Sequence, residues 1–358
     1  MLTLHPERHD PLAAEFCARF LSRTSAPRYV LGRNSYAASI AKCVEIDGFI
    51  DDFTHDTGFL GKPILKMDQV PRGSLVVSAV IFVVPLTALA NLTSHGLLGL
   101  DYFKFKNYSG LPLPDIGFLT DSREDIKTHL PIYQSLHERM EDAESRRVLE
   151  HLLNFRYSGD LTHMLGFENA QDRQYFEGFL DLQPGDVFVD AGGFDGQTTA
   201  DFIRNCPDYG AVHLFEPDLA NLALARSNLS LQRDIHFHAL GLAESNKTLR
   251  FSSGGGSASM VSETGDVIIS VAAIDNVVAE PVSLIKMDIE GAEGAALTGA
   301  RAHILQDHPK LAICCYHKFD DLWKIPEQVL AMRDDYSVYL RHYTEGLHET
   351  VVYFIPRG

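Results

Sequence analysis

The sequence predicts an α/β protein with a mostly parallel sheet, because short apolar runs alternate with helix-like stretches. The clearest example lies in the middle of the chain. Residues 187–189 (VFV) read as a strand buried on both faces, which ends at Asp190. A glycine-dense turn, a helix-like segment (197–206) and a second buried strand (212–215) that ends at Glu216 follow. Strand, glycine turn, helix, strand and acid is the order of a Rossmann-like βαβ unit.

The acids around this turn indicate the class of ligand. A dinucleotide would place its pyrophosphate on the turn and on the helix N-terminus, where Asp190 and Asp195 would repel it. S-adenosylmethionine has no phosphate and carries an ammonium and a sulfonium group, which suit carboxylates. Glu216 lies twenty residues past Gly196 and suits the ribose diol of either ligand. The residues therefore favour a methyl-donor site over a nicotinamide site, and a turn that merely needs glycine is the structural alternative.

Composition and charge narrow the possible partners. The chain has 358 residues, 45% hydrophobic and 22% charged, which is ordinary for globular proteins. Its net charge of −17 without a basic cluster argues against a nucleic-acid partner. Five cysteines without CxxC spacing predict a cytoplasmic protein without structural zinc. The N-terminus lacks a signal-peptide pattern, and Pro85 and Asn91 interrupt the most apolar run, so we expect no membrane span.

Residues 1–110 are predicted to form a smaller Rossmann-like α/β domain. Its first turn contains one glycine, Gly32, which makes a poor phosphate cradle, so a structural module without cofactor is an equal alternative. Residues 111–174 are predicted to form a helical connection, with a linker at 106–116. The expected elements of the first domain are a helix at 12–21, a strand at 29–31, a helix at 35–44, and strands at 44–50 and 75–80.

Residues 175–358 are predicted to form the main domain, in which strand ends converge. Ligands of an open parallel sheet bind outside the carboxyl ends of its strands, at the point where strand order reverses. The other expected elements are a helix capped by Asp218, strands at 235–239, 284–287 and 310–316, a helix opening at 290–293 and reaching 304, a mobile loop at 252–259, and an antiparallel pair at 337–340 and 351–355. Five predicted strands end at Asp190, Glu216, Ala239-Leu240, Asp288 and His317, which we expect to line one rim.

The stretches FVDAGGFDGQTT, HLFEPD and especially IKMDIEGAEGAALTGA resemble the FkbM family of S-adenosylmethionine-dependent methyltransferases. The resemblance covers about residues 175–317, and YHKFDDLWKIP and YLRHYTE are similar to the tail of longer members. It implies a class I, doubly wound methyltransferase domain that methylates a hydroxyl of a sugar, a glycan or a polyketide-type product. Gly193 stands where a more usual member has alanine. The residues expected to bind the donor are Asp190, Gly192, Gly193, Asp195, Gly196, Glu216, Pro217, Ala239, Leu240 and Asp288.

Methyl transfer requires an aligned acceptor oxygen and removal of its proton. His317 is the expected general base and Asp288 its rival, although His317 as a mere strand-end residue is equally consistent. Asp288, Glu290 and Glu293 suit a divalent cation, but the two glutamates equally suit a helix N-terminus, so no metal site is favoured.

Two other functions remain open at this stage, a nicotinamide-dependent oxidoreductase and a non-catalytic protein that keeps the methyltransferase fold. The expected partner is a small-molecule or glycan acceptor, as in polysaccharide biosynthesis, and a homo-oligomer is an option. The sequence identifies neither the acceptor nor the role of the first domain.

Overall fold

The computed structural model describes residues 2–6, 9–22, 26–117, 119–252, 260–261 and 267–357. It divides into two compact units, each of which is described by itself. Unit 1 comprises Met1–Leu130, Arg147–Gln171 and His342–His348, and unit 2 comprises Pro131–Arg146, Asp172–Arg341 and Glu349–Gly358. The units therefore interleave along the chain, whereas the division at residues 110 and 174 stays a prediction.

Unit 1 contains a six-stranded sheet in the order β3-β4-β2-β1-β5-β6. Its strands pair in parallel except for the short β3–β4 pair. The strands are β1 (Arg28–Leu31), β2 (Gly48–Ile50), β3 (Gly58–Phe59), β4 (Lys62–Leu65), β5 (Leu75–Ser78) and β6 (Leu98–Asp101). Its first helices are α1 (Pro11–Leu21), α2 (Ser35–Cys43), α3 (Pro85–Ser94) and α4 (Tyr102–Ser109). The expected linker at 106–116 therefore begins inside α4.

At the N-terminus of α3, the hydrogen-bond donors of Thr87 are paired with Glu345, which lies far along the chain. Glu345 accepts hydrogen bonds from the backbone N–H of Thr87 at 2.7 Å and from its hydroxyl. Gly346 packs so closely against the segment before α3 that an added Cβ would lie 2.2 Å from the Phe82 carbonyl oxygen. These contacts explain why residues 342–348 belong to unit 1, and they place a carboxylate at a helix N-terminus, where it is stabilised by the helix dipole.

Residues 111–174, which were predicted to form a helical connection, contain α-helices. They are α5 (Leu119–Thr128), α6 (Leu130–Arg139) and α7 (Ala143–Ser158). In unit 2, Asp142 accepts from Arg341 at 2.6 Å and from the backbone N–H of Ser145 at 2.7 Å. Burial would raise the pKa of Asp142, but hydrogen bonds from Arg341 and Ser145 outweigh it and lower the pKa to about 2.

This carboxylate predicts an acid-dependent contribution to stability. Because the pKa of Asp142 is lower in the folded state, the contribution is present above pH ~4 and is lost as pH falls toward ~2. The side chain is 36% exposed, so we discount the contribution to about 1 kcal/mol. Urea unfolding at pH 7 and pH 3 should show the difference between wild type and Asp142→Asn shrinking at the lower pH. A difference that stays constant would contradict this account.

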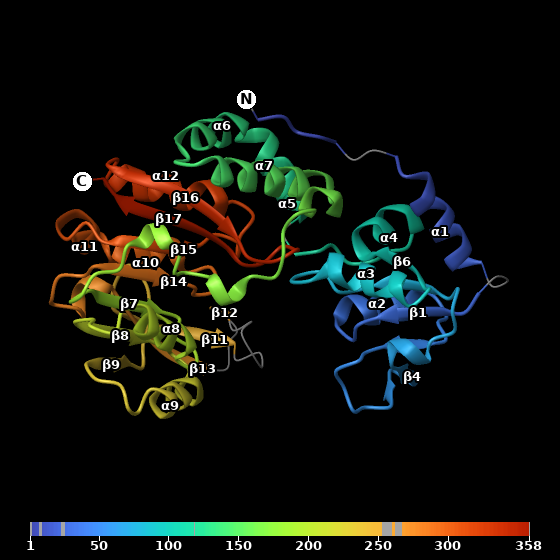
Figure 1. The fold of residues 1–358 in the computed structure, drawn as a ribbon, viewed down its shortest axis with the longest axis horizontal. Helices are drawn as coiled ribbons and strands as arrows, with labels where there is room; N and C mark the ends of the chain where they lie inside the picture. The colour runs from blue at the N-terminus through green and yellow to red at the C-terminus, as the bar shows by residue number, and fades with distance from the viewer. Residues whose placement is uncertain are drawn as a thin grey trace. The chain divides into compact units, whose positions relative to one another are not determined.

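Unit 2 contains a seven-stranded sheet in the order β16-β17-β15-β14-β7-β8-β9 (Figure 1). The five strands from β15 to β9 are parallel, and β17 runs antiparallel to β15. The seven strands of this sheet are β7 (Val187–Ala191), β8 (Ala211–Phe215), β9 (Ile235–His238), β14 (Leu284–Met287), β15 (Lys310–Cys314), β16 (Tyr336–His342) and β17 (Thr350–Pro356). The chain builds β7, β8 and β9 in one direction and β14 and β15 in the other, so strand order reverses between β7 and β14.

The described α-helices that follow β7 in unit 2 are α8 (Gln197–Asn205), α9 (Leu219–Asn228), α10 (Glu293–Gly299), α11 (Arg301–Gln306) and α12 (Asp321–Met332). Asp218 caps α9 as predicted, accepting from the backbone N–H groups of Ala220 and Asn221. The single helix expected to reach residue 304 is instead two helices, which meet at Ala300.

A second, four-stranded sheet of unit 2 was not predicted. Its order is β10-β13-β11-β12, with β10 (Gly241–Leu242), β11 (Lys247–Ser252), β12 (Met260–Val261) and β13 (Val267–Ala272). Ser252 belongs to β11, and the rest of the expected loop at 252–259 lies outside the described residues.

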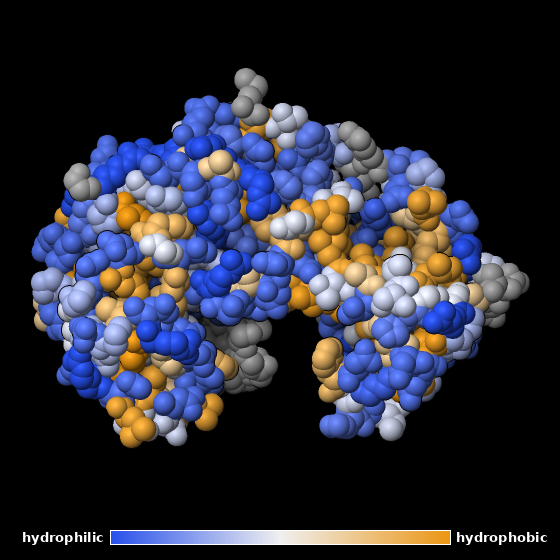
Figure 2. Space-filling model, in the orientation of Figure 1, coloured by the Kyte–Doolittle hydropathy of each residue, from blue (hydrophilic) through white to orange (hydrophobic). Residues whose placement is uncertain are grey.

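On the face shown in Figure 2, hydrophilic residues cover much of the surface and hydrophobic residues form separate groups. Each helix in the described part of the chain is too short or too polar to span a bilayer. The five cysteines are free thiols.

Candidate functional site

A cavity of about 550 Å³ lies where strand order reverses in unit 2, which is where open α/β sheets bind ligands. Its wall comes from the segments that follow four neighbouring strands. The lining includes Gly192 and Phe194 after β7, Glu216 and Pro217 after β8, Leu240 and Gly241 after β9, and Asp288, Ile289 and Glu290 after β14.

The structure brings only part of the predicted site to this wall. The predicted residues that line the cavity are Gly192, Glu216, Pro217, Leu240 and Asp288. Those that do not are Asp190, Gly193, Asp195, Gly196, Ala239 and His317.

The turn after β7 requires glycine at two positions. Gly192 has a φ of +77°, and a Cβ there would lie 2.0 Å from the Asp288 carbonyl oxygen. A Cβ on Gly193 would lie 2.3 Å from Cγ of Leu214 in β8. The alanine of more usual family members would therefore not fit here without a shift of Leu214. The backbone of the turn therefore packs directly against the end of β14.

Asp190 is fully buried behind the cavity wall. Its carboxylate accepts from the Thr199 hydroxyl at 2.8 Å and from Lys286 Nζ at 3.1 Å. Lys286 Nζ also donates to the carbonyl oxygens of Ala191 and Gly192 at 3.2 and 2.8 Å. Because Lys286 neutralises Asp190, the expected repulsion between Asp190 and a pyrophosphate does not hold.

Asp195 likewise turns toward its own chain. Its Oδ1 accepts from the backbone N–H of Gln197 at 3.1 Å, at the start of α8, while Gly196 is the N-cap residue of that helix with a φ of +87°. Asp195 and Gly196 therefore form the start of α8, and neither residue lines the cavity.

Glu216 joins the turn to the end of β8. Its carboxylate accepts from the backbone N–H of Phe194 at 3.1 Å and from that of Asp218 at 2.9 Å. Burial raises the pKa of Glu216, and these two hydrogen bonds offset part of the effect. The carboxylate is thus held in a defined position at the cavity wall.

Asp288 is held by two tyrosines. Tyr175 donates to its Oδ2 at 2.8 Å and Tyr316 donates to its Oδ1 at 3.3 Å. Tyr175 is buried and has a φ of +74°, a conformation that costs energy in a residue with a Cβ. Burial would raise the pKa of Asp288, but His317, Lys286 and Tyr175 hold it well below its usual range.

His317 follows β15, next to β14 as predicted, but it sits among carboxylates. Its Nδ1 lies 2.9 Å from Glu293 Oε1, and its Nε2 lies 3.3 Å from Asp288 Oδ1 and 3.8 Å from Glu290 Oε2. Burial would lower the pKa of His317, but Asp288 and Glu293 raise it to about 11. The imidazole is therefore protonated near neutral pH, and the prediction of a neutral histidine base does not fit this environment.

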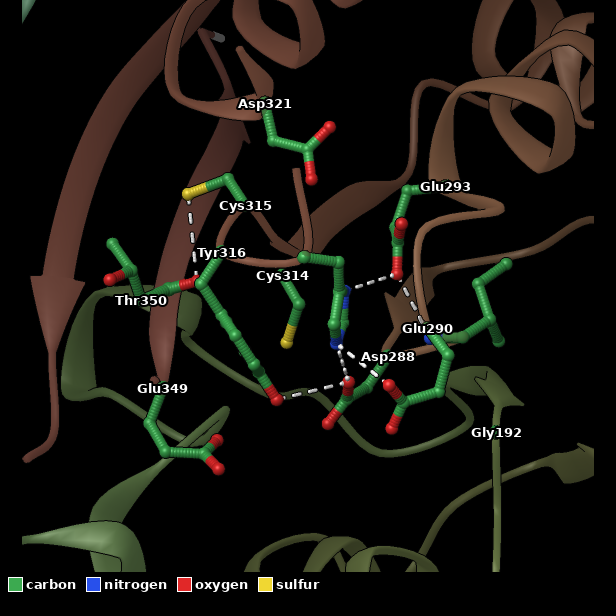
Figure 3. A network of polar contacts seen from close by, with 12 residues as sticks. Gly192, Asp288, Glu290, Glu293, Cys314, Cys315, Tyr316, Asp321, Glu349 and Thr350 are labelled. Atoms are coloured by element: carbon green, nitrogen blue, oxygen red, sulfur yellow. Dashed lines mark hydrogen bonds and ion pairs between the residues drawn. The ribbon is translucent and has the colours of Figure 1, made fainter. Parts of the chain in front are cut away.

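Glu290 is the acid of this group that lines the cavity together with Asp288. Its φ is +54°, again unusual for a residue with a Cβ, and its side chain is 36% exposed. Burial raises the pKa of Glu290 to about 7. Figure 3 shows Asp288 and Glu290 close together, with Glu293 and Tyr316 on either side of them.

Several residues of the site escaped the sequence analysis. Lys286 and Tyr175 act on Asp190 and Asp288 from distant positions in the chain. The second sheet adds an apolar part of the wall, formed by Leu242, Leu249, Ile269 and Val271. Lys286 lies within the stretch IKMDIEG, whose resemblance to the family was the one feature of the sequence that could have marked it as a site residue.

Comparisons with known proteins identify the family to which the domain around this cavity is similar. Residues 190–344 match the model of the methyltransferase FkbM domain. The chain contains a methyltransferase FkbM domain. It is similar to the crystal structure of methyltransferase FkbM from Methylobacillus flagellatus KT, with 25% identity over 97% of this chain and 94% of that one and a TM-score of 0.75. The predicted fold class and family resemblance are thereby confirmed.

Other similarities are weaker. SMU.1697c, a putative methyltransferase from Streptococcus mutans in complex with SAH, is 14% identical over 49% of this chain and 91% of that chain, with a TM-score of 0.31. Aeropyrum pernix fibrillarin with bound S-adenosyl-L-methionine is 12% identical over 52% and 73%, with a TM-score of 0.33. A search of curated proteins returned no match.

Proposed function

We propose that this FkbM-domain protein is an S-adenosylmethionine-dependent O-methyltransferase that acts on a hydroxyl of a sugar, a glycan or a related natural product. The observation that carries the proposal is the cavity at the strand-order reversal of a methyltransferase domain, bounded by Gly192, Glu216 and Asp288. The comparisons support methyl transfer, the family resemblance implies a hydroxyl acceptor, and the carboxylates at the cavity can take the proton of such a hydroxyl.

The cavity fits S-adenosylmethionine in size and chemistry. Its volume is within the range of small-molecule sites. The apolar wall from the second sheet suits the flat adenine, and the close approach of Gly192 to the Asp288 carbonyl oxygen holds the turn against the end of β14 at the cavity wall. When bound, S-adenosylmethionine supplies an electrophilic methyl group on a sulfonium, and Asp288 and Glu290 are acids that suit this positive charge.

The proposed donor-binding residues divide into two groups. Glu216 accepts the ribose hydroxyls, Gly192, Pro217 and Leu240 shape the wall, and Asp288 lies on the methionine side. Asp190, Gly193, Asp195, Gly196 and Ala239 support the wall from behind.

On the acceptor side, Asp288 and Glu290 face the cavity. We propose that Glu290 takes the proton of the acceptor hydroxyl, because it is the less committed of the two carboxylates. Asp288 already accepts from Tyr175 and Tyr316. His317 is then a positioning residue, which holds Asp288 from the side away from the cavity.

Glu216→Ala is expected to lower the affinity for S-adenosylhomocysteine by about tenfold or more. The change removes charge-assisted hydrogen bonds to the ribose, worth about 1.5–3 kcal/mol. Calorimetric titration of the folded variant measures the loss. The matched control is Glu327→Ala, which removes an exposed glutamate from α12 and should bind normally. Wild-type affinity in a folded Glu216→Ala variant would rule out the ribose role.

The acceptor class is tested by a methyl-transfer screen with labelled S-adenosylmethionine. Nucleotide sugars, glycan fragments and hydroxylated polyketide-type compounds form the panel, with the corresponding amines as a comparison. Label found on a hydroxyl oxygen is the expected result. Transfer to the amines alone would overturn the O-methylation proposal and leave the methyltransferase assignment intact.

A further inference from the structure

A cluster of charged side chains lies beside the cavity, and we name it the carboxylate cage: Asp288, Glu290 and Glu293 around His317. Asp288, Glu293 and His317 each offer one ligand atom, and these atoms lie within 4.8 Å of one another. Asp288 follows β14, Glu293 is the first residue of α10, and His317 lies after the end of β15. The three acids lie within six residues of one another in the sequence, and the fold adds the imidazole of His317 from a distant segment.

The cage contains buried polar atoms that lack hydrogen-bond partners. Among the described residues, Glu293 Oε2 and both ring nitrogens of His317 form no hydrogen bond, although the ring nitrogens lie at ion-pair distances from carboxylates. Glu293 is 1% exposed and the His317 side chain 8% exposed. The carboxylates pair with the ring nitrogens of a protonated His317, but Glu293 Oε2 has no such contact, and a buried polar atom without a partner is costly, so this oxygen indicates a missing ligand.

The charge of the cage indicates the kind of ligand. Three carboxylates surround one imidazole, and the nearest buried lysine, Lys286, is committed to Asp190. Glu293 is buried, whereas the side chains of Asp288 and Glu290 are 24% and 36% exposed, and the negative charge that the three acids share is stabilised by a cation. One imidazole with carboxylate oxygens is a donor set for Mn²⁺, Fe²⁺ or Zn²⁺.

We propose that Asp288, Glu293 and His317 bind one divalent transition-metal cation, with Glu290 between this cation and the cavity. The cation replaces the proton that the carboxylates otherwise hold on His317. Asp288 and Glu290 both line the cavity, so a cation held by the cage would lie at the cavity edge. If the proposed O-methyl transfer is correct, this cation would help to orient the acceptor oxygen.

A second group of ligand-type residues provides a control. His213, His236 and Glu280 also offer ligand atoms within 4.8 Å of one another, on the β8–β9 side of the sheet. His236 is exposed, and His213 Nε2 already contacts Glu280 Oε1 at 2.8 Å. This group therefore has a protein partner for its buried nitrogen, and the cage is the better cation site.

The test is calorimetric titration of Mn²⁺ into the full-length protein after removal of metals with a chelator. Wild type and His236→Ala are expected to bind one cation per chain with the same affinity. His317→Ala and Asp288→Asn are each expected to weaken binding by about tenfold or more, as loss of ligand groups does. Asp288→Asn keeps the side-chain shape, so the test stands even where His317→Ala fails to fold.

No binding of Mn²⁺ to wild type, or equal binding to wild type, His317→Ala and Asp288→Asn, would overturn the proposal. Loss of binding in His236→Ala would move the cation to the other group and overturn it too. A parallel titration with S-adenosylhomocysteine separates the two proposals, because donor binding without Mn²⁺ binding refutes the cation site alone.

Discussion

Lys286→Met is expected to destabilise the protein by about 3–5 kcal/mol, the usual effect of leaving one charge of a buried pair alone. Lys286 and Asp190 are 2% and 0% exposed, and Lys286 also satisfies two carbonyl oxygens of the glycine turn. Methionine preserves the length of the side chain but none of these contacts. The midpoint of urea unfolding at pH 7 measures the loss.

The matched control is Lys127→Met. Lys127 also pairs with a carboxylate, Glu124, at 2.8 Å, but 51% and 76% of the two side chains are exposed. We expect this variant to unfold close to the wild-type urea midpoint, because exposed ion pairs contribute little to stability. If Lys286→Met loses as little as the control, the buried pair is not what holds the turn in place.

Glu290→Gln is expected to lower turnover by about 10²–10⁴-fold, the usual range for loss of a general base. Glutamine has the same shape but cannot take the acceptor proton. Affinity for S-adenosylhomocysteine should stay near the wild-type value, because this product lacks the sulfonium charge and the other proposed donor contacts come from other residues. The measurements are turnover with an acceptor from the screen and a calorimetric titration of the donor product.

Glu327→Gln on α12 is the control for this change and should keep wild-type turnover. Turnover of Glu290→Gln within about threefold of wild type would place the base elsewhere, with Asp288 as the next residue to test. A loss of donor affinity that matches the loss of turnover would assign Glu290 to donor binding.

The parallel strands and the local turns could be predicted because their signals are local. A strand covered on both faces contains a short apolar run, such as residues 187–189 of β7, and a helix start such as that of α9 carries its own cap, Asp218. Strand ends in a parallel sheet share one edge, and that placed Glu216 and Asp288 together at the cavity.

The rest depends on contacts between distant positions. Lys286 lies inside an otherwise apolar strand, and its role is apparent only from its contact with Asp190, which is distant in the sequence. Tyr175 donates to Asp288 from a segment that precedes β7. His317 was correctly placed next to β14, but its protonation depends on Glu293, which arrives from the start of α10. The second sheet was missed because its short strands lie beside a serine- and glycine-rich stretch that reads as a loop.

The central claim is that the cavity binds S-adenosylmethionine, and calorimetric titration with S-adenosylhomocysteine and with NADH tests it most directly. The account predicts binding of S-adenosylhomocysteine and no heat from NADH. Binding of NADH without S-adenosylhomocysteine would contradict it in favour of an oxidoreductase, and no binding of either would contradict it in favour of a non-catalytic protein that keeps the fold.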